Sequence, residues 1–143
     1  MKRCMYNKEL LVHILHQTEE ALRKILTRFE AVDSVAYFTD TPEGMEKLDS
    51  ICMLLIATGE SLKNIDKITE KQLLSCYPEI DWKGAKGMRD IISHHYFDID
   101  AEEIFWVCQY NIEPLADTIH RIIEDVGSSR ACLHDRNTPN VDM

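Results

Sequence analysis

Seven consecutive residues in the middle of the chain, Ile51 to Ala57, are apolar, and this run constrains the fold more than any other segment. Around it, apolar residues recur every three or four positions, which predicts a helix. A helix that is apolar on every side must be covered on more than one side. The cover is either the rest of the monomer, with this helix at its centre, or a second copy of the chain.

The same helical spacing recurs along the chain, and residues that commonly start or stop helices separate the segments. The expected starts and stops are Asn7 to about Val32, a possible extra turn at Val35–Phe38, Asp40 to about Ile65, Thr69 to Tyr77, Asp81 onward, Asp100 onward, and Asn111 to Gly127. The sequence therefore predicts an all-α, up-and-down bundle of about five helices. We expect one domain over residues 1–127 and a disordered polar tail over residues 128–143.

The cysteine content and the apolar runs of the sequence indicate the cellular compartment. The five cysteines are scattered without a CxxC pair, which argues against a disulfide framework or a zinc site and favours a reducing cytoplasm. No apolar run approaches the roughly 20 residues of a membrane span, and we expect no signal peptide. His13 and His16 lie three apart without a third ligand nearby, so we expect neither a metal nor a cofactor.

The segment from Lys86 to Phe97 concentrates chemically active side chains: Arg89, Asp90, Ser93, His94, His95 and Tyr96. The planar guanidinium of an arginine can bind phosphate through several hydrogen-bond donors at once. A histidine can gain or lose a proton near neutral pH. The segment is therefore the first candidate for a functional site.

Helical geometry limits how these side chains can cooperate. At about 100° per residue, Arg89, Ser93 and Tyr96 share one stripe, while Arg89 and His94 point roughly 140° apart. They can serve one substrate if the helix ends near His94, or if two copies of the segment meet. A purely structural alternative stays open, in which a histidine lies near the C-terminal helix dipole and Arg89 makes a surface ion pair.

Three neighbouring features bear on this segment. Gly59 lies inside a predicted helix and suggests close helix packing, and Glu60 beside it could pair with Arg89 or Lys86. Two more glycines, Gly84 and Gly87, could let another backbone or a phosphate approach the motif helix closely, and tight packing against a neighbouring helix is the favoured explanation.

The order Arg-x4-His-x-Tyr, formed by Arg89, His94 and Tyr96, resembles the signature of the HepT-like (DUF86) branch of the HEPN superfamily. The likeness extends over roughly residues 7 to 126 and includes Gly59-Glu60 and the segment 78–82. The resemblance implies a HEPN-like homodimer that cuts RNA without a metal, with Arg89 and His94 catalytic. Asp90, Ser93 and His95 are expected to support them.

The resemblance also implies a partner and a form of control. HepT-like toxins are paired with a small nucleotidyltransferase antitoxin, which AMPylates the motif tyrosine, here Tyr96. The added phosphate would block the site by charge and bulk. The expected function is thus a toxin endoribonuclease of a toxin-antitoxin pair.

The net charge of −9 opposes this hypothesis, because nucleic-acid binders usually carry a basic surface. Lys83, Lys86 and Arg89, with the two histidines, are expected to form a small basic island. The alternative is a non-catalytic helical module that binds a nucleotide or forms a complex with a nucleotidyltransferase.

Overall fold

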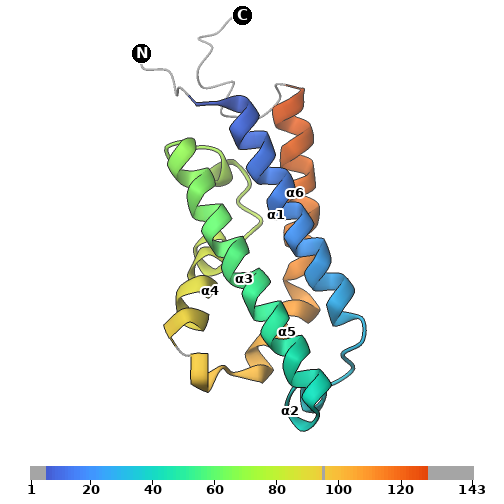
Figure 1. Ribbon diagram of the computed structural model, residues 1–143. Helices are drawn as coiled ribbons and strands as arrows, with labels where there is room; N and C mark the ends of the chain where they lie inside the picture. Colours follow the sequence, from blue (N-terminus) through green and yellow to red (C-terminus); the bar gives the residue numbers. More distant parts are fainter. Residues whose placement is uncertain (1–5, 95, 129–143) are drawn as a thin grey trace, which may run out of the picture.

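The computed structural model describes residues 6–94 and 96–128, without the side chains of His94 and Tyr96. These residues form six α-helices and two 3-10 turns, and they contain no strand (Figure 1). The elements are α1 (Lys8–Phe29), α2 (Val35–Asp40), α3 (Pro42–Ile68), η1 (Leu74–Cys76), α4 (Trp82–His94), η2 (Tyr96–Asp98), α5 (Ala101–Tyr110) and α6 (Ile112–Gly127). The predicted all-α class is confirmed, with α2 as the extra turn of helix.

The long helices run up and down beside one another. In Figure 1, α1, α3 and α4 alternate in direction, and α6 returns alongside α1. Helix α3 packs against α1, α2 and α4, which makes it the central helix.

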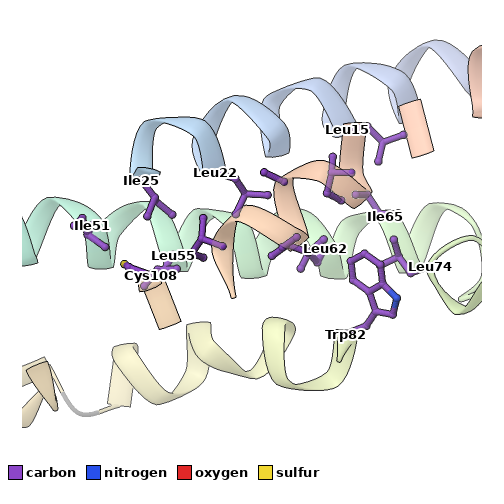
Figure 2. Packing of buried hydrophobic residues seen from close by; sticks show 14 of the residues in the cluster. Leu15, Leu22, Ile25, Ile51, Leu55, Leu62, Ile65, Leu74, Trp82 and Cys108 are labelled. Atoms are coloured by element: carbon purple, nitrogen blue, oxygen red, sulfur yellow. The ribbon is translucent and has the colours of Figure 1, made fainter. Parts of the chain in front are cut away.

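The core confirms the central position of α3. Figure 2 shows side chains of α1, among them Leu15 and Leu22, directed toward Leu55 and Leu62 of α3. All four are buried. Within the apolar segment 51–57, Ile51, Cys52 and Leu55 are buried in the monomer, and Leu54 and Ile56 are partly buried. Met53, at 69% exposed, and Ala57 remain exposed.

Local capping explains most helix starts. Asn7 caps α1 and accepts a hydrogen bond from the Leu10 amide, and Asp100 caps α5 by accepting from the amides of Glu102 and Glu103. The expected cap of α3 at Asp40 is wrong by one residue. Thr41 accepts from the Gly44 amide instead.

The predicted helix from Thr69 to Tyr77 is also wrong. Thr69 ends α3 as its C-cap, and its hydroxyl donates to the carbonyl of Ile65. Glu70 and Lys71 then adopt positive φ angles of 55° and 63°, which turn the chain back. Only the short turn η1 follows.

Other expectations have mixed outcomes. Cys52 and Cys108 are free and buried, but Cys76 is disulfide-bonded, which the scattered spacing of the cysteines did not predict. Across residues 6–94 and 96–128, no helix combines the length and apolarity needed to cross a membrane. Apart from Ser128, the predicted tail over residues 128–143 lies outside the described residues.

Candidate functional site

Helix α4 carries the motif, and its first turn is fixed locally. The Asp81 carboxylate accepts a hydrogen bond from the Gly84 amide at 3.0 Å, as the predicted cap should. Trp82 is buried and donates from Nε1 to the carbonyl of Tyr77 at 2.8 Å. Arg89 and His94 were expected to serve one substrate if the helix ends near His94. Helix α4 does end at His94, so the backbone meets this condition.

Helices α3 and α4 lie close together where Gly59 faces Arg89. A Cβ atom at position 59 would lie 2.8 Å from the Arg89 Cβ and 3.2 Å from the carbonyl oxygen of Lys86. Such a contact is too short for any side chain, so glycine is required for this spacing. The predicted close packing at Gly59 is confirmed.

The other two glycines behave differently. A Cβ at Gly84 would meet the carboxylate of Asp81 within the same turn, and one at Gly87 would meet nothing within 4 Å. The prediction that both mark packing against a neighbouring helix is therefore wrong.

Arg89 is held by two carboxylates. Its Nε lies 2.5 Å from Oε2 of Glu60 on α3, and its Nη1 donates to Oδ1 of Asp90 at 2.9 Å. Nε itself is shielded from solvent, and its contact with Glu60 is an ion pair. The possible Glu60–Arg89 pair is thus observed.

Two lysines near Arg89 also form ion pairs with carboxylates. Lys63 Nζ lies 3.5 Å from Oδ2 of Asp90, and Lys86 Nζ forms an ion pair with Asp66. Of the predicted basic island, Lys86 and Arg89 are therefore paired with carboxylates of α3 and α4. Lys83 has no ion pair among the described residues, and the side chains of the two histidines lie outside them. These pairs are also what the structural alternative for Arg89 predicts.

The ion pairs shift the protonation equilibria in the expected directions. The hydrogen bond to Asp90, followed by the charge of Glu60, raises the pKa of Arg89. The hydrogen bond from Arg89 lowers the pKa of Asp90, and Lys63 lowers it further. The arginine stays charged, and the aspartate stays ionised through the neutral range.

The structure brings together only part of the predicted site. Arg89 and Asp90 are adjacent and half-exposed, and Ser93 is exposed one turn further along α4. The side chains of His94 and Tyr96, and all of His95, lie outside the described residues. The cleft expected to join Arg89, His94 and Tyr96 stays a prediction.

A groove of about 580 Å³ lies elsewhere on α4, between that helix and α5 and α6. Its lining is mainly apolar and includes Met88, Ile91, Val107 and Tyr110. Arg89 and Asp90 do not line it. A mainly apolar wall suits RNA phosphates poorly, so the motif remains the better candidate site.

Within the described residues, no three His, Cys, Asp or Glu side chains gather as metal ligands would. The expectation of metal-independent chemistry stays a prediction. Two residues of α3 contact the motif: Lys63, which the sequence did not suggest, and Glu60, which was expected only as a possible partner of Arg89 or Lys86. Their spacing of three on α3 places them on one face of that helix, but only the packing of α3 on α4 assigns them to Arg89 and Asp90.

The comparisons with known proteins define the class. Residues 18–122 match the family described as Ribonuclease HepT-like. The chain therefore belongs to the HepT-like ribonuclease family, and the resemblance drawn from Arg89, His94 and Tyr96 is confirmed.

Three relatives come from Methanocaldococcus jannaschii. The protein named Putative RNase MJ1216 is 31% identical over 104 residues, which cover 68% of this chain and 82% of that protein. Putative RNase MJ0127 is 32% identical over 68 residues, or 48% of this chain and 53% of the relative. Putative RNase MJ0125 is 33% identical over 78 residues, or 54% of this chain and 63% of the relative. No solved structure matches the chain.

Proposed function

We propose that this protein is a metal-independent endoribonuclease that acts as a homodimer. The observation that carries the proposal is the placement of Arg89: a half-exposed guanidinium fixed between two helices, on a helix that ends at His94. Family membership and relatives named as RNases support the same activity.

The proposed reaction uses the RNA itself as nucleophile. The ribose 2′-hydroxyl attacks the adjacent phosphate, a neutral imidazole of His94 takes its proton, and an imidazolium returns a proton to the leaving 5′-oxygen. Arg89 stabilises the negative charge that builds on the non-bridging oxygens. Ser93 and His95 support binding beside these groups.

Two copies of the motif facing each other across a twofold axis would supply two arginines and two histidines to one cleft. This arrangement removes the limit set by the 140° separation on a single helix. Light scattering at micromolar concentration tests it. A dimer is expected, and a monomer that still cuts RNA would contradict it.

We also propose a cognate nucleotidyltransferase that AMPylates Tyr96 and so silences the nuclease. Tyr96 follows His94 by two residues, in the turn η2. An added phosphate there would compete for the Arg89 guanidinium.

The main test is RNA cleavage in EDTA by the wild type, Arg89→Ala and His94→Ala. We expect cleavage by the wild type, loss in both variants, and a milder effect of His95→Ala. Wild-type protein that cuts no RNA would contradict the proposal.

The second candidate is a non-catalytic module that binds a nucleotide or a nucleotidyltransferase. One observation favours it: Glu60 and Asp90 already neutralise Arg89, in a chain of net charge −9. Binding of ATP or of the partner without any RNA cleavage would select this candidate.

A further inference from the structure

The Asp90 carboxylate bridges two cations that come from different helices. Its Oδ1 lies 2.9 Å from Nη1 of Arg89 on α4, and its Oδ2 lies 3.5 Å from Nζ of Lys63 on α3. The exposed fractions of these side chains are 37% for Arg89, 41% for Lys63 and 47% for Asp90. A ligand in solution can therefore reach all three groups.

A phosphodiester has the features that Asp90 presents here. It carries one negative charge shared by two non-bridging oxygens, and charged donors of Arg and Lys bind such oxygens strongly. The carboxylate thus occupies, between one arginine and one lysine, a position that suits a phosphodiester.

Glu60 and Asp90 contact different edges of the Arg89 guanidinium. It lies against Nε, on the side where Gly59 brings α3 close to the Arg89 Cβ. A phosphate that replaces Asp90 at the Nη edge leaves this second ion pair in place. Arg89 can then exchange one anion for another without losing its position.

We propose that Asp90 is a placeholder for a phosphodiester of the RNA, and that Lys63 is a second phosphate ligand beside Arg89. The assignment rests on the proposed function. On binding, the phosphate takes the places of the two Asp90 oxygens, and the displaced carboxylate turns toward water. Glu60 keeps the guanidinium in place throughout.

The test measures binding apart from cleavage. The probe is a short fluorescent oligonucleotide with 2′-O-methyl riboses, which keeps the phosphates and lacks the attacking hydroxyl. Its Kd is measured by fluorescence anisotropy with the full chain at low salt, where ion pairs are least screened.

We expect Asp90→Asn to bind this probe about two- to fivefold more tightly than the wild type, because a competing surface ion pair is removed. We expect Lys63→Gln to bind it more weakly by a similar factor. The matched controls are Asp49→Asn and Lys67→Gln, which change the net charge equally on α3. Neither control residue has an ion pair among the described residues.

The outcomes separate this inference from the proposed function. Asp90→Asn binding no tighter than Asp49→Asn, or Lys63→Gln binding no weaker than Lys67→Gln, overturns the inference even if the protein cuts RNA. Both expected shifts in a protein that cuts no RNA support the phosphate site and reject the nuclease. Thermal unfolding of each variant shows whether the fold is retained, and an unfolded Asp90→Asn is replaced by Asp90→Ala under the same criterion.

Discussion

Gly59 of α3 lies directly against Arg89 of α4, with the site of a Cβ on Gly59 only 2.8 Å from the Arg89 Cβ. The absence of a side chain on one helix thus sets the position of a charged side chain on the other. This contact ties the stability of the bundle to the placement of the proposed phosphate ligand.

Gly59→Ala should destabilise the protein and reduce RNA cleavage. Alanine improves helix propensity by about 1 kcal/mol, but overpacking costs typically 1–3 kcal/mol, so we expect a net loss of up to about 2 kcal/mol. Gly87→Ala is the matched control. A Cβ at position 87 would contact no atom within 4 Å, so this substitution should stabilise the protein by up to about 1 kcal/mol. Urea unfolding measures the free energy of unfolding of both variants. Equal changes for the two substitutions would contradict the close packing of Gly59 against Arg89.

Glu60→Gln should lower kcat by about tenfold or more while changing KM little, because a misplaced catalytic group loses rate more than affinity. The substitution keeps the shape of the side chain and removes the charge beside Nε of Arg89. The NMR resonance of the Arg89 Nε–H group should shift in the same variant. Glu46→Gln, on the same helix and exposed, is the control, and an equal effect of both variants on kcat would refute the role given to Glu60.

Cys52 and Cys108 should resist alkylation in the folded protein at pH 8. Burial raises the pKa of each thiol to about 12, with a smaller contribution from Asp49 for Cys52 and from Cys52 for Cys108. The reactive thiolate is therefore scarce until the pH approaches that value or the protein unfolds. Iodoacetamide labelling followed by peptide mass spectrometry, with and without urea, checks this. Rapid labelling of either residue in the native state would be inconsistent with a buried thiol.

Tyr96→Phe should keep much of the nuclease activity and make it insensitive to the nucleotidyltransferase. The substitution removes the hydroxyl proposed to accept AMP and keeps the ring. Intact mass after incubation with the partner enzyme and ATP measures the modification. Unmodified wild-type protein, or equal modification of the Phe variant, rules out Tyr96 as the acceptor.

The helices could be predicted from the sequence because their determinants are local. Apolar spacing and the caps Asn7, Asp81 and Asp100 lie within a few residues of the structures they specify. Errors arose where two local solutions compete. Thr69 could either start a new helix or end α3, and the turn at the following two residues favours the second.

The site was less predictable because it depends on contacts between helices. Gly59 and Gly87 look alike in the sequence, yet only Gly59 faces the other helix. The pairing of Lys63 with Asp90 likewise follows from the register of α3 on α4, which no short motif specifies. The sequence motif identifies Arg89, but the arrangement of the residues that contact it depends on the tertiary structure.

The most direct test of the central claim is the chemistry of the RNA ends. Attack by the 2′-hydroxyl predicts products with 2′,3′-cyclic phosphate and 5′-hydroxyl ends, formed in EDTA by the wild type and lost in Arg89→Ala and His94→Ala. Mass spectrometry of the products of a defined oligoribonucleotide identifies these ends, and its 2′-O-methyl counterpart should stay intact. Products with 3′-hydroxyl and 5′-phosphate ends, or cleavage undiminished in His94→Ala, would contradict the account.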